Sequence, residues 1–132
     1  LNLCTGITLG VIVENFEKIF VDGVFVIAVN LTHSTIIEAD EFKEIIEEEI
    51  NSDHTNLVID LSKCDYIDST FFGAIIWALG ELSEKGRKLK VVKQAISKED
   101  IFTITNTLSV FDLYKTREDA IKSFEEDIQS ES

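Results

Sequence analysis

Residues Asn56–Leu82, NLVIDLSKCDYIDSTFFGAIIWALGEL, contain a short apolar run, a polar triplet and an apolar helical pattern in direct succession. The run Leu57–Leu61 is too short for a helix and is typical of a central parallel strand covered on both faces. The residues after the triplet DST at 68–70 predict a helix to about residue 85, ended by Gly86 in a left-handed C-cap. The stretch therefore predicts a strand and a helix joined by a turn that carries a carboxylate and two hydroxyls.

Before this stretch the sequence predicts a hairpin and then an amphipathic helix. Segment Glu17–Leu31 holds two β-branched and aromatic runs around Asp22-Gly23, a dipeptide that favours a type I′ turn, and its second strand should be buried. In 36–50, acidic residues alternate with apolar residues at helical spacing, namely Phe42, Ile45, Ile46 and Ile50. The acidic face of this helix is either a docking surface for a basic partner or a solvated face, and the sequence leaves both readings open.

After the stretch the pattern continues to alternate. Leu89–Val92 predicts a strand, Ser97 and Asp100 cap a helix over 101–108, and 110–114 predict a short strand. Thr116 with Asp119 then caps a last helix. The order predicts an α/β fold, a mixed sheet of four to five strands with about four helices packed on it, in one domain over 1–132. Residues 1–15 form an extension or an extra strand, and 125–132 should fray.

Composition limits the partners and the compartment. The 132 residues carry 25 acidic and 12 basic side chains, a formal charge of -13, which opposes binding to nucleic acid or an anionic membrane. Cys4 and Cys64 are far apart and predict neither a disulfide framework nor a zinc site. We find no secretory signal and no apolar run long enough to span a membrane, so a soluble, cytoplasmic protein is expected.

Catalytic patterns are absent from the sequence. It has no Gly-x-Ser-x-Gly elbow, no phosphate loop and no His-Glu-x-x-His pair. His33 and His54 stand alone in polar stretches and are interpreted as solvated loop residues. Asp60, Asp65 and Asp68 are near one another in sequence, but nothing supplies the paired environment that acid-base catalysis needs. We therefore expect a protein that is not an enzyme and that has no cofactor and no metal.

A helical wheel divides the predicted helix after the triplet into two faces. The apolar stripe that should face the sheet consists of Phe72, Ile75, Ile76, Leu79 and Leu82. The opposite face consists of Thr70, Gly73, Ala74, Trp77 and Glu81. An aromatic residue among small residues suggests a surface kept clear for a partner, although Trp77 could equally pack under a neighbouring part of its own domain.

The triplet itself has two readings. Asp, Ser and Thr are favoured N-caps, because a side-chain oxygen accepts from the free N–H groups of the first turn. Capping alone explains the three residues. A helix N-terminus is also a position prepared to hold a phosphate, so the same hydroxyls are candidates for a regulatory modification.

The stretch VIDLSKCDYIDSTFFGAIIWALGEL resembles the central signature of STAS domains, the family of anti-sigma-factor antagonists and related regulatory modules. In that family a strand of the type hydrophobic-Asp-Leu leads to Asp-Ser-Ser/Thr-Gly-Leu-Gly and a helix. The resemblance covers roughly Phe16 to Phe124. Phe71 stands where the first glycine is usual, and the loop Thr32–Thr35 lacks the usual Gly-x-Leu-Asp pattern.

The resemblance implies a function and a set of site residues. Thr70 matches the phospho-acceptor that a serine/threonine kinase of the anti-sigma type modifies and a PP2C-type phosphatase restores, with Ser69 as second choice. The expected function is a phosphorylation-controlled interaction module that binds the kinase while Thr70 is unphosphorylated and thereby frees a sigma factor. The residues expected to contact the partner are Asp68, Ser69, Phe71, Ala74 and Trp77.

Two alternatives remain open at this stage. The chain could be a structural STAS subunit of a larger signalling assembly, and its oligomeric state is not set by the sequence. It could also bind a nucleotide or another small anion through the hydroxyl-rich loop Thr32–Thr35 near the helix start.

Overall fold

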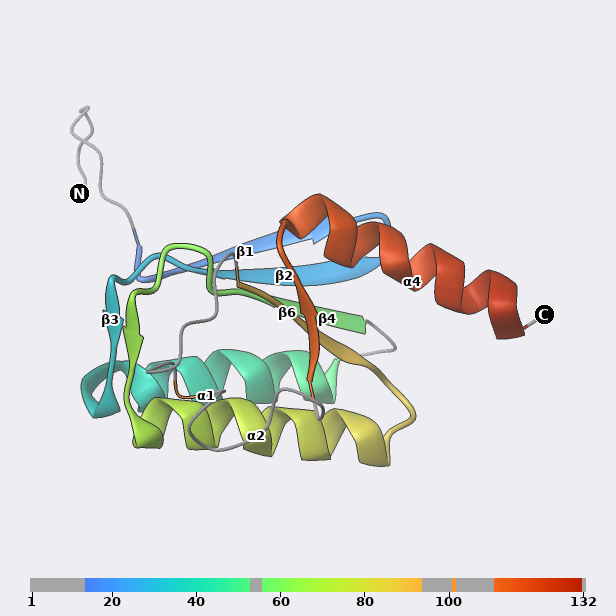
Figure 1. Ribbon diagram of the computed structural model, residues 1–132. Coiled ribbons are helices and arrows are strands. Elements are labelled where there is room, and N and C mark those ends of the chain that lie inside the picture. The colour runs from blue at the N-terminus through green and yellow to red at the C-terminus, as the bar shows by residue number, and fades with distance from the viewer. Residues whose placement is uncertain (1–13, 53–55, 94–100, 102–110, 132) are drawn as a thin grey trace, which may run out of the picture.

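The computed structural model describes residues 14–52, 56–93, 101 and 111–131. Its main sheet has the strand order β1-β2-β4-β6-β7 (Figure 1). Strands β1 and β2 are antiparallel, and every later pair is parallel. The bounds are Phe16–Val21 for β1, Val24–Val29 for β2, Asn56–Asp60 for β4, Leu89–Val92 for β6 and Asp112–Tyr114 for β7. The predicted mixed sheet is confirmed, with β4 at its centre.

The turn between β1 and β2 adopts the geometry that its sequence predicts. Asp22 has φ 51° and Gly23 has φ 77°, so both central residues lie in the left-handed region that a type I′ turn requires. The predicted buried second strand is also confirmed, since only Phe25 in β2 is half-buried. This hairpin leaves β1 at one edge of the sheet.

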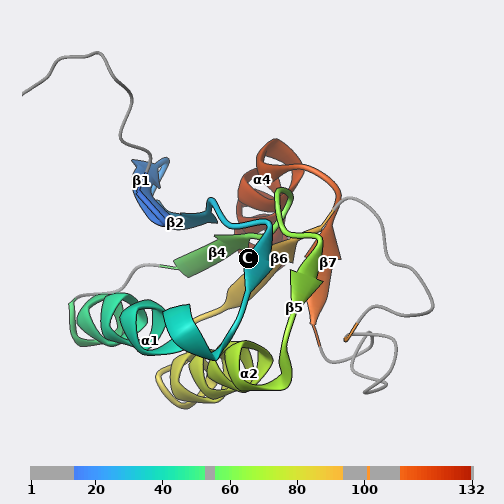
Figure 2. The same cartoon turned by 90° about the vertical axis from the view of Figure 1, so that its left-hand side faces the viewer.

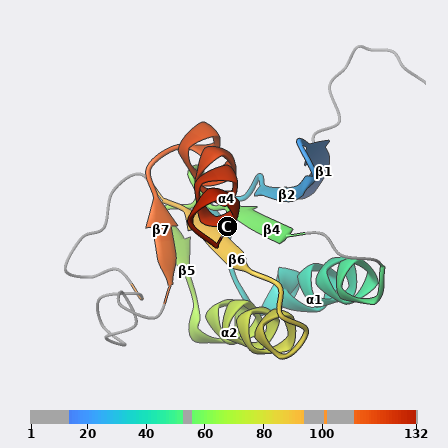
Figure 3. The same cartoon turned by 90° about the vertical axis from the view of Figure 1, so that its right-hand side faces the viewer.

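Helices cover both faces of the sheet. Helices α1 (Ile36–Asn51) and α2 (Ser69–Glu84) lie side by side against one face, and α4 (Arg117–Glu131) lies against the other (Figures 1 and 3). Helix α2 ends where predicted, because Gly86 adopts φ 69°. Thr116 accepts a hydrogen bond from the Asp119 amide through Oγ1 at 3.1 Å and so caps the start of α4 as predicted.

Each face of the sheet has its own core. Between the sheet and the pair α1 and α2, Phe42 and Phe71 are in ring contact at 4.6 Å. Both are fully buried, and Phe16 from β1 stacks on the same cluster. Between the sheet and α4 lies a smaller core of Val24, Val26, Val58, Val92, Ala120 and Phe124. These two hydrophobic cores hold the three helices against the sheet, and they therefore also set the positions of the helix ends.

A second, very short sheet lies beside the helix N-termini (Figure 2). Strand β3 (His33–Ser34) pairs in parallel with β5 (Tyr66–Ile67). The pairing continues into the triplet, because the Asp68 amide donates to the Ser34 carbonyl at 2.9 Å. This small sheet therefore holds the connection before α1 against the connection before α2.

Some predictions fall outside the described residues. They are the N-terminal segment over 1–13 and most of the helix over 101–108, of which only Ile101 is described and is helical. Residues 125–131 belong to α4, and their predicted fraying concerns motion and stays a prediction. Within the described part of the chain, none of the helices combines the length and the apolar character needed to cross a membrane.

Candidate functional site

The polar triplet forms the start of α2. Asp68 is the N-cap, in an extended conformation, and its Oδ1 accepts a hydrogen bond from the Phe71 amide at 2.9 Å. Ser69 and Thr70 are the first two helical residues, and both side chains are exposed. The capping reading of the triplet is therefore correct for Asp68. The two hydroxyls remain at the surface.

The same aspartate also caps the neighbouring helix. Its Oδ2 accepts a hydrogen bond from the Ile36 amide, the first helical residue of α1, at 2.8 Å. The N-terminus of α1 also has a capping box of its own, formed by Thr35 and Glu38. In it, Glu38 Oε1 accepts a hydrogen bond from the Thr35 amide at 3.0 Å. One carboxylate thus joins two helix N-termini, and a sequence pattern cannot show this contact because the partners are 32 residues apart.

Two backbone N–H groups of the first turn of α2 remain available. The Asp68 amide donates to Ser34, the Phe71 amide to the Asp68 side chain and the Phe72 amide to the Asp68 carbonyl. Among the described residues, the amides of Ser69 and Thr70 have no such acceptor. Free amides at a helix N-terminus stabilise negative charge, so the start of α2 can accommodate an anionic group beside these hydroxyls.

Exposed apolar side chains lie next to the triplet. Ile36 is 64% exposed and Ile37 is 83% exposed at the start of α1, and Tyr66 is 54% exposed two residues before Asp68. Together with Ser69 and Thr70 they are called the tip surface here. Figure 1 shows both helices beginning at the same end of the molecule, beside β3. Exposed apolar groups gathered at one end of a domain can form a contact surface for another protein.

The structure corrects two of the residues expected to contact a partner. Phe71 is fully buried and Ala74 is 4% exposed, so neither side chain can reach one. The reason is that α2 packs on α1 as well as on the sheet, which turns this side of the helix inward. The aromatic ring at the position where the family usually has glycine is therefore buried, and it fills the space under α1.

The two faces predicted for α2 are partly wrong for the same reason. Ile76, placed in the apolar stripe, is 42% exposed, whereas Ala74, placed outside, is buried. Trp77 is half-buried, and the Lys43 Nζ of α1 lies 5.2 Å from the centre of its ring. The tryptophan thus packs against a neighbouring helix of its own domain while part of it stays at the surface.

The hydroxyl-rich loop before α1 uses two of its hydroxyls inside the protein. Ser34 is fully buried, and its Oγ lies 3.3 Å from Cys64 Sγ. Burial raises the pKa of the Cys64 thiol, and the hydrogen bond with Ser34 opposes that shift in part. Thr35 Oγ1 accepts from the Ile37 amide and donates to Glu38. These contacts argue against the loop as a small-anion site.

The aspartates that follow one another in the sequence lie in different surroundings. Asp60, 5% exposed at the end of β4, forms an ion pair with Arg117 at 2.9 Å and accepts from the Ser62 amide. Asp65 is exposed, and Asp68 caps the helices. Among the described residues, no cluster of three His, Cys, Asp or Glu side chains is arranged to hold a metal ion.

Comparison with known proteins places the chain in a family. The model of the STAS domain matches residues 11–120. The chain belongs to the STAS domain family. No curated protein matches the sequence of this STAS domain.

Several solved structures similar to this STAS domain carry the name anti-sigma factor antagonist. One from Mycobacterium paratuberculosis is 23% identical, with a TM-score of 0.73 over 82% of this chain and 91% of the other. The STAS domain protein from Planctomyces limnophilus is 14% identical, with a TM-score of 0.71 over 83% and 97%. The Bacillus cell fate determinant SpoIIAA in its phosphorylated form is 14% identical, with a TM-score of 0.65 over 83% and 98%. At these identities the likeness shows the fold.

Proposed function

We propose that this STAS domain is a phosphorylation-controlled interaction module, an anti-sigma-factor antagonist that binds a serine/threonine kinase of the anti-sigma type while Thr70 is unphosphorylated. The observation that carries the proposal is the exposed Thr70 hydroxyl at the second residue of α2, beside exposed Ile36 and Ile37. Similar structures named as anti-sigma factor antagonists support the same role, and SpoIIAA is among the similar structures in both an unphosphorylated and a phosphorylated form. The role is one of binding, without catalysis by this domain.

The tip surface offers a partner both apolar and polar contacts. Ile36, Ile37 and Tyr66 would be removed from water on binding, at about 25 cal/mol for each Å² of apolar area. Thr70 and Ser69 would lie within the same contact. Asp68 then acts by fixing the helix ends on which these residues stand, and Trp77 adds contact area farther along α2.

A phosphate on Thr70 would leave the fold intact. It adds a charge of about -1.5 to -2 at neutral pH. The N-terminus of α2 stabilises a negative charge by about 0.3 to 1 kcal/mol, which partly offsets repulsion from the carboxylate of Asp68. The acceptor lies outside the core, so no packed side chain has to move.

The same phosphate would abolish binding. A fitted contact that covers Thr70 would have to bury an unpaired anion, which is strongly unfavourable in a desolvated interface. Each 1.4 kcal/mol lost changes the dissociation constant about tenfold. A PP2C-type phosphatase would restore the binding form, and we place this cycle in the cytoplasm.

The experiment is phosphorylation by the kinase that co-purifies with the unmodified protein. Incubation with ATP is expected to add one phosphate, located on Thr70 by mass spectrometry of the peptides. The variant Thr70→Ala should receive none, and the matched variant Ser69→Ala should be labelled like the wild type. Labelling that persists in Thr70→Ala would move the site, with Ser69 as the first candidate.

A second measurement separates the contact surface from the acceptor. Ile37→Ser changes an exposed apolar residue and is expected to weaken kinase binding at least tenfold, whereas Phe20→Ser, an exposed apolar residue of β1 outside the tip surface, should not. Equal affinity of both variants would place the kinase on another face of the domain.

A further inference from the structure

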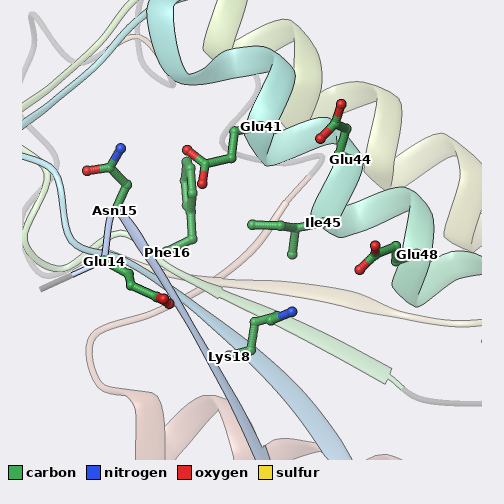
Figure 4. A pocket seen from close by; sticks show the side chains of 8 residues that line it. All are labelled: Glu14, Asn15, Phe16, Lys18, Glu41, Glu44, Ile45 and Glu48. Carbon is green, nitrogen blue, oxygen red and sulfur yellow. The ribbon is translucent and has the colours of Figure 1, made fainter. Parts of the chain in front are cut away.

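A cleft separates the edge strand of the sheet from the first helix. It has a volume of about 530 Å³ and lies between β1 and α1 (Figure 4). Its lining residues are Glu14, Asn15, Phe16, Lys18, Glu41, Glu44, Ile45 and Glu48. We call it the edge groove. None of these residues belongs to the tip surface, so the groove requires an explanation of its own.

Strand β1, whose residues Phe16 and Lys18 line the edge groove, has backbone groups that face outward. The Asn30 amide donates to the Asn15 carbonyl at 2.8 Å, which makes this pair a hydrogen-bonded pair of the antiparallel ladder. Because such pairs alternate along an antiparallel strand, the N–H and C=O groups of Phe16, Lys18 and Phe20 point away from β2. Strand β1 is terminal in the described sheet, and an open edge is a template for pairing with another strand.

Side chains of an added strand would reach the groove on one face only. Phe16 points from β1 into the core under α1, so Lys18 and Phe20, two and four residues later, stand on the same face. Phe20 is 67% exposed there. On the opposite face of β1 lies half-buried Ile19. An added strand would therefore place alternate residues over the groove and the others beside an apolar surface.

The wall of the groove is acidic. Glu41, Glu44 and Glu48 follow one another at intervals of three and four residues, so they lie on one side of α1, and all three line the groove (Figure 4). Glu14 adds a fourth carboxylate at the start of the strand, and Lys18 is the only base among the lining residues. The groove therefore favours cationic side chains at every second position of an incoming strand.

We propose that the edge groove accepts an extended segment of a partner protein with alternating Lys or Arg residues, which adds to β1 as a further strand. Backbone pairing with Phe16, Lys18 and Phe20 supplies the register, and the glutamates of α1 select the charge. A second copy of this chain would bring acidic groove against acidic groove. The chain's own first 13 residues contain neither Lys nor Arg and so lack the matching charge.

The test uses the whole domain and a fluorescent nine-residue peptide of alternating lysine and valine, with binding measured by anisotropy. The control peptide has the same composition with its lysines in one block. We expect saturable binding of the alternating peptide, weakened by added salt. The double variant Glu44→Gln/Glu48→Gln should bind at least tenfold more weakly. The matched variant Asp40→Asn/Glu47→Gln, which removes two exposed charges of α1 outside the groove, should bind nearly as the wild type.

A proline tests the strand pairing. Since the Lys18 N–H points outward, Lys18→Pro removes one edge donor and keeps the pairing with β2, whereas Lys18→Ala removes only the charge. Peptide binding should be lost in Lys18→Pro and kept in Lys18→Ala, with circular dichroism showing both variants folded. Equal binding of both peptides, equal losses in the two double variants, or equal binding of both Lys18 variants would overturn the proposal. Self-association that Lys18→Pro abolishes would also overturn it, by assigning the edge to a second copy.

Discussion

The carboxylate of Asp68 accepts hydrogen bonds from two helices at once, from the Ile36 amide of α1 at 2.8 Å and from the Phe71 amide of α2 at 2.9 Å. The side chain is only partly buried, yet it fixes the relative position of the two helix N-termini. The tip surface depends on this contact, because its residues stand on those two ends and on the small sheet beside them.

Loss of this double cap should destabilise the domain. Asp68→Ala removes the acceptor of two backbone donors, and we expect the free energy of unfolding to fall by about 2 kcal/mol. Urea denaturation measures the change. Asp65→Ala, at an exposed position three residues earlier, is the control and should stay within about 0.5 kcal/mol of the wild type. Equal stability of the two variants would mean that solvent replaces both bonds without cost.

Placing glycine at residue 71, where glycine is usual in the signature that the sequence resembles, should destabilise this domain strongly. Phe71→Gly empties a fully buried site between Phe16 and Phe42 and places glycine in a helix, so a loss of about 4 kcal/mol is expected. Phe71→Leu keeps most of the volume and should lose about 1 to 2 kcal/mol. Thermal unfolding ranks the three proteins. A stable Phe71→Gly variant would show that the core closes around the missing ring.

The buried thiol should make stability depend on alkaline pH. Burial raises the pKa of Cys64 above its ordinary value of 9.0, so between pH 9 and the folded-state pKa the unfolded chain releases a proton that the folded chain retains. Stability contributed by the neutral thiol is therefore complete below pH 9 and declines as the pH rises through this window. Urea midpoints at pH 8 and pH 10 should differ more for the wild type than for Cys64→Ala, which shares every other titrating group. Parallel pH dependence would contradict the buried position of the thiol.

The ion pair of Asp60 and Arg117 joins the end of β4 to the start of α4. Removing the base in Arg117→Met leaves a carboxylate that is 5% exposed, and we expect a loss of about 2 kcal/mol. Adding Asp60→Asn should recover part of that loss, because the neutral amide needs no counter-charge. A double-mutant cycle measures the coupling between the two side chains. A coupling below about 0.5 kcal/mol would show that the pair contributes nothing to the attachment of α4.

Local patterns were sufficient to predict most of the fold. The Asp22-Gly23 turn, the acidic helix α1 and the strand β6 follow from turn chemistry and periodicity, which depend on neighbours in sequence. The parallel order of β2, β4 and β6 follows from the alternation of strands and helices.

What the sequence could not show depends on contacts between distant residues. A helical wheel assumes that one side of a helix is covered, but α2 packs on both the sheet and α1. The contact with α1 buries Ala74, whereas Ile76 remains exposed. The strands β3 and β5 are two residues each, too short for any periodic signal. The hydrogen bond from the Ile36 amide to Asp68 joins residues 32 positions apart, so it can be seen only in the folded structure.

The double cap has a consequence for how a signal at Thr70 would be read. Because the N-termini of α1 and α2 are both hydrogen-bonded to the Asp68 carboxylate, the backbone there would change conformation little on modification of the Thr70 hydroxyl. The modified and unmodified proteins would then share one outline and differ in the electric potential at one end. A modification of Thr70 would then need no conformational change elsewhere in the domain to be detected, because the partner would contact the modified residue directly.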